Sequence, residues 1–357
     1  MERREIWQLV DARDIGGIER HIGELVGALG ARGVACRAVL YQRYTPSPLL
    51  DLLRREGIPH LELDGSPRTL LAALRQHRPA LLHTHGYKAG IVGRPCARLL
   101  GIPVVSSFHA GETGPWPLWF YQAIDEWTSV LASRIAVSSS IAARLPWKST
   151  LVENFVRLPE LPARAERRLR VAFVGRLSTE KGPDVFCQIA ETVGPCVEWD
   201  IYGDGALRDA LKGCAPPFVR FHGFVPDMND VWPQVDLLLM PSRAEGLPMA
   251  ALEALSRGIP VAASAVGGLP DLLGADAGRW LFPASDVGRA ASVVDAFRYL
   301  TDRERAELRG KLRDVIRHRF SPDAVLPKVL DVYREAGWSC EASSSTNVQS
   351  SMASGAN

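Results

Sequence analysis

Residues 235–254, VDLLLMPSRAEGLPMAALEA, are the most informative stretch of this 357-residue chain. The apolar run at 235–240 predicts a buried strand. The residues that follow predict a loop and then a helix that begins at Pro248, because a proline at the first helical position loses no hydrogen bond. A buried strand that passes through a short loop into a helix is typical of an α/β domain.

Two glutamates flank the start of this helix. Glu245 lies in the loop and Glu253 inside the helix, and the helical rise places them roughly 12 Å apart. This span matches the reach from a sugar ring, across a diphosphate, to a ribose. Between them, the backbone N–H groups of Gly246, Leu247 and the first helical turn suit a phosphate. The alternative is that the glutamates only complement the helix macrodipole.

Strand and helix patterns alternate along the whole chain. In the first half, strands are predicted at 6–10, 34–40, 80–83, 104–108 and 135–138, and helices at 17–32, 48–56, 68–78, 88–100 and 116–131. In the second half, strands are predicted at 170–174, 197–202, 218–221, 235–240, 260–263 and 279–282, before helical segments at 286–319 and 323–336. The fold class is therefore α/β, with two doubly wound parallel sheets that bind ligands beyond the carboxyl ends of their strands.

The domain boundaries follow from breaks in this alternation. We expect an N-terminal domain at 1–160, a linker rich in proline and charge at 161–168, and a C-terminal domain at 169–320. A final helix at 321–338 is expected to cross back to the first domain. The Ser/Ala/Asn-rich residues 339–357 have no periodicity and are predicted to be disordered.

The composition is that of a soluble globular protein, 46% hydrophobic and 23% charged, with a net charge of +2. No apolar stretch is long enough to span a bilayer and no signal peptide is evident, so we expect a cytoplasmic protein without a nucleic-acid partner. The mildly basic first half could favour an anionic membrane surface, although such an imbalance is ordinary between two domains. The six scattered cysteines are expected to be reduced thiols.

A second strong motif lies at 171–182, VAFVGRLSTEKG. The strand delivers Arg176 to its carboxyl end, and Lys181 follows in a tight loop. Arginine offers a fork of donors to a phosphate and lysine offers a point charge, so together they would neutralise a diphosphate. A surface arginine and lysine near a helix cap are the alternative, which the apolar strand leading into Arg176 weakens.

Glycine and histidine motifs end strands of the first half. Gly16 and Gly17 open the first helix and either let the backbone approach an anion or form a plain turn. His83 and His85 could bind a metal, but the sequence offers no matching third ligand. His109, at the next strand end, is the better candidate for a working role, with a polar loop residue as the alternative.

Three weaker turns follow strands of the second half. Asp204, in YGDG at 202–205, is expected to cap the next helix. The segment at 221–225 could line a base pocket, and the glycine turn at 265–270 either closes on a ligand or connects elements. The chain contains no Gly-Lys-Ser/Thr phosphate loop, no nucleophile elbow and no Asp-x-Asp metal motif, so we expect no required metal ion.

The motifs in this order and spacing resemble those of the retaining glycosyltransferases of family 4, the glycosyl transferases group 1, which have the GT-B fold. The resemblance covers nearly the whole chain and rests on Val174-Gly175-Arg176…Lys181-Gly182, Gly203-Asp204-Gly205, His222-Gly223 and Pro241-Ser242…Glu245-Gly246…Glu253-Ala254. It implies two Rossmann-like domains facing a cleft, with the acceptor on the N-terminal domain and the nucleotide sugar on the C-terminal one.

The resemblance also implies roles for the candidate residues. Glu245 matches the glutamate that contacts the donor hexose, and Glu253 matches the one that binds the ribose. Arg176 and Lys181 match the pair on the diphosphate, and His109 matches the histidine near the reacting sugar.

Backbone groups have implied roles as well. Gly16 and Gly17 match the loop near the phosphates and acceptor, and the backbone of Gly246, Leu247 and Pro248 would hold phosphate and hexose oxygens. The implied donor is a UDP- or GDP-sugar rather than an ADP-sugar. The implied acceptor is a glycan or a lipid-linked glycan of cell-envelope polysaccharide, lipopolysaccharide or exopolysaccharide synthesis.

The implied mechanism is front-face substitution, in which a diphosphate oxygen accepts the proton of the acceptor hydroxyl. A nucleotide-sugar 2-epimerase on the same fold and a non-catalytic sugar-nucleotide-binding protein are the alternatives. The aromatic segment at 111–121 forms either a surface for acceptor or membrane, or a packed helix start.

Overall fold

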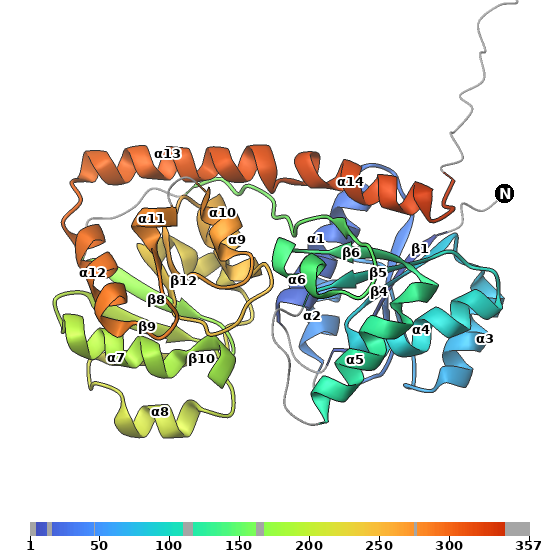
Figure 1. Cartoon of the computed structure of the whole chain (residues 1–357), viewed down its shortest axis with the longest axis horizontal. Helices are drawn as coiled ribbons and strands as arrows, with labels where there is room; N and C mark the ends of the chain where they lie inside the picture. The colour runs from blue at the N-terminus through green and yellow to red at the C-terminus, as the bar shows by residue number, and fades with distance from the viewer. Residues whose placement is uncertain are drawn as a thin grey trace, which may run out of the picture.

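The computed structural model describes residues 5–12, 16–45, 47–109, 117–161, 168–274 and 277–339. Two α/β domains lie side by side, and a long helix followed by a shorter one runs across both of them (Figure 1). The first part of the predicted aromatic segment (111–116), most of the linker and the tail from 340 onward lie outside the described residues.

The N-terminal domain is built on a parallel sheet that comprises, in the described residues, seven strands in the order β3-β2-β1-β4-β5-β6-β7. The strands are β1 Ile6–Val10, β2 Cys36–Leu40, β3 His60–Glu62, β4 Leu81–His85, β5 Val104–Phe108, β6 Ser133–Ala136 and β7 Thr150–Leu151. The helices are α1 Gly17–Ala31, α2 Pro48–Arg55, α3 Pro67–His77, α4 Tyr87–Leu99, α5 Leu118–Thr128 and α6 Ser139–Arg144. Because helices cover both faces of the sheet, β1 and β4 are buried along their whole length.

The C-terminal domain has a parallel sheet in which the described residues form six strands, in the order β10-β9-β8-β11-β12-β13. The strands are β8 Arg170–Val174, β9 Glu198–Tyr202, β10 Val219–Gly223, β11 Leu237–Met240, β12 Val261–Ser264 and β13 Leu281–Phe282. The helices are α7 Pro183–Val193, α8 Arg208–Cys214, α9 Met249–Ser256, α10 Leu269–Leu273, α11 Ala277–Trp280, α12 Val287–Arg298 and α13 Asp302–Arg319.

Each sheet reverses its strand order at one point, between β1 and β4 in the first domain and between β8 and β11 in the second. Parallel sheets bind ligands beyond the carboxyl ends of the strands at such a reversal. The loops that follow β1, β8 and β11 therefore define where a site forms. All three carry motifs identified in the sequence.

The last helix, α14 Pro322–Glu335, returns to the N-terminal domain and packs beside α1 (Figure 1). Val325, Leu326 and Tyr333 are fully buried in the same apolar cluster as Ile6 of β1. The backbone N–H of Val156 also donates to the carbonyl oxygen of Phe320, just before α14. The final helix is thus part of the first domain's core.

The predicted α/β class with two doubly wound parallel sheets is confirmed, while several boundaries were wrong. The predicted helix at 286–319 is two helices, because the Thr301 hydroxyl accepts from the backbone N–H of Glu304 and starts α13 anew. β4 extends to His85, so both histidines of the motif lie within the strand. The prediction missed the short β3 and β7 and the helix α6.

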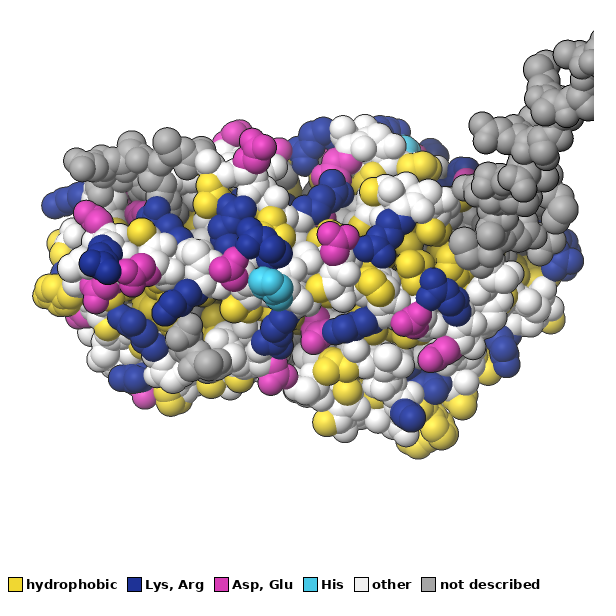
Figure 2. All heavy atoms as spheres, turned by 90° about the horizontal axis from the view of Figure 1, so that it is seen from above, with side chains coloured by type: hydrophobic (Ala, Val, Ile, Leu, Met, Phe, Trp, Pro, Cys, Tyr) yellow, Lys and Arg dark blue, Asp and Glu magenta, His cyan; other side chains and the backbone are white. Residues whose placement is uncertain are grey.

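The face that carries α13 and α14 mixes both signs of charge. Figure 2 shows Lys and Arg side chains interspersed with Asp and Glu side chains over this face. Ion pairs such as Arg303–Glu307 and Arg334–Asp331 account for part of this pattern. Among the described residues of this face, the two signs of charge therefore alternate rather than form one basic stripe. In the part of the chain that the structure describes, no helix is long and apolar enough to cross a membrane.

Candidate active site

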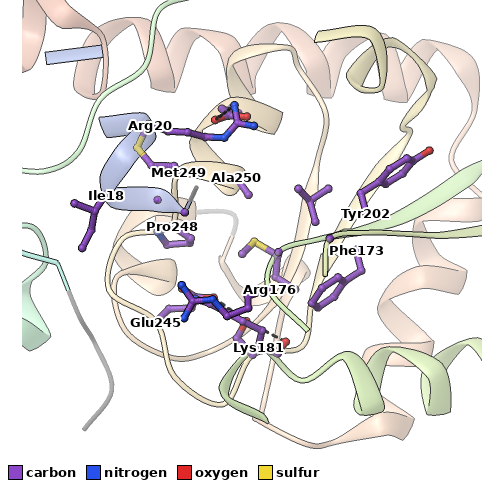
Figure 3. A pocket seen from close by; sticks show the side chains of 18 of the residues that line it. Ile18, Arg20, Phe173, Arg176, Lys181, Tyr202, Glu245, Pro248, Met249 and Ala250 are labelled. Carbon is purple, nitrogen blue, oxygen red and sulfur yellow. Dashed lines mark hydrogen bonds and ion pairs between the residues drawn. The ribbon is translucent and has the colours of Figure 1, made fainter. Parts of the chain in front are cut away.

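A cavity of about 680 Å³ lies between the two domains, at the carboxyl ends of both sheets. Helix α1 supplies one wall, and the loops after β8 and β11 supply the other (Figure 3). The sequence-predicted site residues all line it: Gly16, Gly17, His109, Arg176, Lys181, Glu245, Gly246, Leu247, Pro248 and Glu253.

The loops after β8 and β11 are joined into one unit. Arg243 donates to the carbonyl oxygen of Thr179 at 2.8 Å and forms an ion pair with Asp184 at 2.6 Å. Gly182 has a φ of 67°, and a Cβ there would collide with the carbonyl oxygen of Pro241. Only glycine permits this approach, so the KG pair of the motif brings Lys181 against the second loop.

Glu245 and Lys181 form the centre of this wall. The Lys181 Nζ lies 2.7 Å from Glu245 Oε2, and the Ser242 hydroxyl donates to Oε1 at 2.8 Å. Glu245 is only 3% exposed, whereas Lys181 is 27% exposed. The pair is therefore a nearly buried carboxylate beneath a lysine that reaches the cavity.

Arg176 adds a second positive charge to the same wall. It follows β8 and is exposed, and Figure 3 shows its guanidinium beside Lys181 and Glu245. The side chain also approaches Gly16 of the N-terminal domain, where an added Cβ would lie 3.8 Å from its Nη2. The two cations together suit the diphosphate of a bound nucleotide.

The start of α9 faces the same space. This helix begins at Met249, and Pro248 is its N-cap with an extended ψ of 128°, so the prediction that Pro248 is the first helical residue was wrong. The backbone N–H groups of Met249 and Ala250 thus belong to the first turn, where helical N–H groups have no partner within the helix. Both residues line the cavity, which makes this end an anion-binding position.

Glu253 lies one turn further along α9 and is 8% exposed. The indole Nε1 of Trp232 donates to its Oε2 at 3.1 Å, and Arg20 of α1 lies 3.6 Å from its Oε1. The sequence analysis missed both partners. Trp232 precedes β11 and Arg20 follows the glycine pair, and neither position carries a signal that points to Glu253.

His109 lies directly after β5, where it meets His85 of β4 and His21 of α1. His85 Nδ1 is 3.2 Å from His109 Nε2, and the rings of His21 and His109 are centred 5.0 Å apart. One ring nitrogen from each of the three residues lies within 4.8 Å of the other two, a spacing open to a divalent metal. This cluster takes His21 from α1 and does not include His83, so it differs from the His83/His85 pair that the sequence motif suggested.

Desolvation favours the neutral form of the three histidine rings. Burial lowers the pKa of His21 to about 4 and holds the pKa of His85 and His109 well below the usual range. The neighbouring rings lower the pKa of His85 and His109 further, since each disfavours positive charge on the next. His109 thus borders the cavity as a neutral hydrogen-bonding group.

His109 is also fixed against the second loop. A Cβ on Gly246 would collide with the carbonyl oxygen of His109, so glycine is required there. The side-chain Nδ2 of Asn154, in the N-terminal domain, donates to the carbonyl oxygen of Leu247 at 2.8 Å. These contacts join the two domains at the cavity.

The C-terminal domain lines the cavity with apolar or aromatic side chains, namely Phe173, Tyr202, Phe224, Val225, Met228 and Met240. Of these, Phe173 and Tyr202 lie together at the end away from α1 (Figure 3). The turn at 202–205 contributes to this end, but Asp204 is not a helix cap: it forms an ion pair with Arg208 at 2.6 Å, and Leu207 precedes α8. An apolar slot beside the two cations is suited to a nucleobase.

The glycine turn after β12 supports the central loop. The backbone N–H of Gly268 donates to the carbonyl oxygen of Gly246 at 2.7 Å. A Cβ on Gly267 would collide with the carbonyl oxygen of Glu245. The sequence left open whether this turn closes on a ligand or connects elements, and in the structure it packs against the loop that carries Glu245.

Comparison with known proteins agrees with the two-domain division. Residues 15–148 match the model described as Glycosyltransferase Family 4, and residues 168–302 match that of Glycosyl transferases group 1. The chain is 30% identical to the 2-deoxystreptamine N-acetyl-D-glucosaminyltransferase of Streptomyces fradiae, with 89% of this chain and 87% of that protein covered. It is 25% identical to the UDP-Gal:alpha-D-GlcNAc-diphosphoundecaprenol alpha-1,3-galactosyltransferase of Escherichia coli, over 74% of this chain and 78% of the other.

Solved structures share the fold at lower identity. Anabaena HepE in complex with UDP and glucose superposes with a TM-score of 0.79 at 17% identity, covering 93% of this chain and all of that one. Staphylococcus aureus TarM, in a complex that contains UDP, has a TM-score of 0.79 at 11% identity, with 92% and 99% covered. The arrangement of the two sheets is thus the GT-B fold. Together with the matches over both domains, this shows that the chain is a glycosyltransferase and belongs to glycosyltransferase family 4.

Proposed function

We propose that this glycosyltransferase transfers a hexose from a UDP-sugar to a hydroxyl of a carbohydrate acceptor, with retention of the anomeric configuration. The observation that carries the proposal is the order of groups along one cavity wall. Glu245, the cations Arg176 and Lys181, the start of α9 and Glu253 follow one another there. This order matches hexose, diphosphate and ribose.

Each part of the donor has a suitable partner in this assignment. Glu245 accepts hydrogen bonds from hexose hydroxyls, Arg176 and Lys181 neutralise the diphosphate, and Glu253 accepts from the ribose hydroxyls. The uracil occupies the apolar slot beside Tyr202. UDP is chosen over GDP because HepE, TarM and the E. coli relative are described with UDP or a UDP-sugar.

The proposed mechanism uses the donor's own phosphate as the base. As the glycosidic bond opens, Arg176 and Lys181 stabilise the charge that develops on the leaving diphosphate, and a diphosphate oxygen accepts the acceptor proton. Glu245 is already paired with Lys181 and Ser242, which suits it to hold the hexose rather than to attack it. The contacts between the domains help to exclude water from the reaction.

The acceptor is proposed to enter from the N-terminal domain, past Gly16, Gly17 and His109. The relatives named above act on an aminocyclitol and on a lipid-linked sugar, so a polyhydroxylated ring is the common chemistry. We favour a glycan or lipid-linked glycan of cell-envelope polysaccharide, lipopolysaccharide or exopolysaccharide synthesis.

A cytoplasmic location at the inner membrane surface fits such an acceptor. The first turn of α5 exposes Trp119, Phe120 and Tyr121, each by nearly half. Exposed aromatic side chains of this kind favour the polar–apolar boundary of a bilayer. Co-sedimentation with anionic vesicles, repeated with a Trp119→Ser/Phe120→Ser variant, tests this part of the proposal. Equal binding of both proteins would remove it.

The proposed donor is tested by calorimetry with UDP, GDP and ADP. We expect UDP to bind most tightly, and a ligand at about 100 times its Kd to stabilise the protein by about 2.7 kcal/mol. A panel of UDP-sugars with candidate acceptors follows, and proton NMR of the product reports the anomeric configuration. Preference for another base, or an inverted product, would refute the corresponding part.

The two alternative functions are separated by the same samples. A 2-epimerase would convert the UDP-sugar without an acceptor, whereas a transferase leaves the sugar configuration at C2 unchanged. A non-catalytic binding protein would bind UDP and form no product with any acceptor. Incubation with donor alone therefore precedes the acceptor screen.

A further inference from the structure

Four buried polar groups behind His109 have no part in the proposed reaction. His85 Nε2 lies 2.8 Å from Gln8 Oε1, and Gln8 Nε2 donates to the Tyr333 hydroxyl at 3.1 Å. The Tyr333 hydroxyl also lies 2.8 Å from His83 Nδ1. Together with the 3.2 Å contact between His85 and His109, these bonds connect the cavity to the C-terminal helix α14.

The chain of bonds is shielded from water throughout. Gln8 and Tyr333 are fully buried, and His83 and His85 are each 1% exposed. Buried polar groups are costly unless every member is paired, and a paired network fixes the orientation of its members. Burying these four polar groups in an otherwise apolar core therefore costs folding stability that a purely hydrophobic core would not lose.

The partners determine where the protons lie. Because Gln8 turns its Nε2 to Tyr333, its Oε1 accepts, and His85 must carry its proton on Nε2. A neutral His85 then presents a lone pair on Nδ1, which accepts from the Nε2–H of His109. The Tyr333 hydroxyl accepts from Gln8 and therefore donates to His83 Nδ1. Reversing the direction of donation along these hydrogen bonds requires the Gln8 side-chain amide to rotate.

We propose that Tyr333, Gln8 and His85 are positioning residues, which hold His109 as the neutral Nε2–H tautomer with a fixed ring orientation beside the donor. The inference rests on the proposed role of His109 near the transferred sugar. It makes α14, which enters the first domain from the second, part of the apparatus that orders the site. The proposed donor-binding residues Arg176, Lys181, Glu245 and Glu253 belong to the other domain, and none of the hydrogen bonds of this network named above includes them.

The test is Tyr333→Phe, which keeps the ring and removes the hydroxyl. We expect kcat to fall about tenfold or more, because a small misplacement of a group at the reacting centre has effects of this size. The Kd for UDP should stay within about twofold. Tyr299→Phe is the matched control, since Tyr299 is 75% exposed and lies in the C-terminal domain. Unchanged kcat in Tyr333→Phe would overturn the proposal.

A second readout needs no substrate. Two-bond proton–nitrogen spectra of the protein labelled with ¹⁵N-histidine identify the tautomer of each ring directly. We expect Nε2–H for His85 and His109 in the wild type and altered His109 resonances in Tyr333→Phe. An Nδ1–H tautomer at His109, or resonances that the substitution leaves unmoved, would overturn the proposal. If the protein does not use the proposed UDP-sugar donor, these spectra remain unaffected. The experiment therefore distinguishes a wrong donor assignment from a wrong positioning network.

Discussion

Replacing Lys181 by methionine separates the two roles that the structure gives this side chain. Methionine keeps most of the volume and removes the charge. The Nζ lies 2.7 Å from a carboxylate that is 3% exposed, so the substitution leaves Glu245 buried with the Ser242 hydroxyl as a donor but without its counter-charge. Breaking a fully buried pair costs about 3–5 kcal/mol, and the 27% exposure of Lys181 lowers our expectation to about 2 kcal/mol.

The same change removes one of two cations from the proposed diphosphate position. Loss of one preorganised group that stabilises developing charge costs about 3 kcal/mol, or roughly 100-fold in kcat/KM. The double variant Lys181→Met/Glu245→Gln removes the buried charge as well. We therefore expect the double variant to regain most of the lost stability and none of the activity.

The assay combines thermal unfolding with steady-state kinetics. A loss of about 2 kcal/mol lowers Tm by roughly 4–8 °C in a domain of this size. Lys212→Met, at an exposed position of α8, is the control for removing a lysine. Wild-type kcat/KM in Lys181→Met would refute the phosphate assignment. A double variant no more stable than the single one would refute the ion-pair reasoning.

Three further predictions concern other parts of the cavity. Trp232→Phe removes the hydrogen-bond donor to Glu253 while keeping an aromatic ring. Because one hydrogen bond to a charged group contributes about 1.5 kcal/mol, we expect UDP binding measured by calorimetry to weaken about tenfold. Unchanged affinity would mean that the indole does not orient Glu253. Burial lowers the pKa of His21 from 6.5 in the unfolded chain to about 4 in the folded protein. The unfolded state therefore binds the proton first, and the free energy of unfolding should fall by about 3 kcal/mol between pH 7 and pH 4 because of this residue. Urea unfolding of His21→Phe should accordingly show a shallower pH dependence than that of the wild type. Dialysis against EDTA should leave kcat/KM unchanged, because Arg176 and Lys181 supply the positive charge at the diphosphate. A loss of activity that Zn²⁺ or Mg²⁺ restores would show that a metal is required.

The main lines of the fold could be predicted because they depend on local patterns. Apolar runs such as 171–173 and 237–240 are buried on both faces, and their composition alone indicates strands of a parallel sheet. The elements that were missed are short: β3 has three residues, and β7 has two. Segments of that length carry too little periodicity to stand out, and pairing with a neighbouring strand decides their structure.

The positions of the site residues could also be anticipated, since each follows a predicted strand. Lys181 and Glu245 were assigned to one ligand from motifs 64 residues apart, and the structure brings them into direct contact. The local geometry was less predictable. Pro248 caps α9 rather than beginning it, because the chain reaches the helix in an extended conformation set by the packed loop.

By itself, the sequence determined the α/β class, the two parallel sheets and the strand ends at which the site lies, because periodicity and glycine turns act between near neighbours in the chain. Only the tertiary structure decided which distant side chains meet. His21 joins His85 and His109, Arg20 and Trp232 reach Glu253, and Tyr333 lies behind the cavity. Such contacts depend on strand order and on the path of α14 across both domains. The sequence near residue 8 or near residue 333 therefore does not indicate that these two side chains form a hydrogen bond.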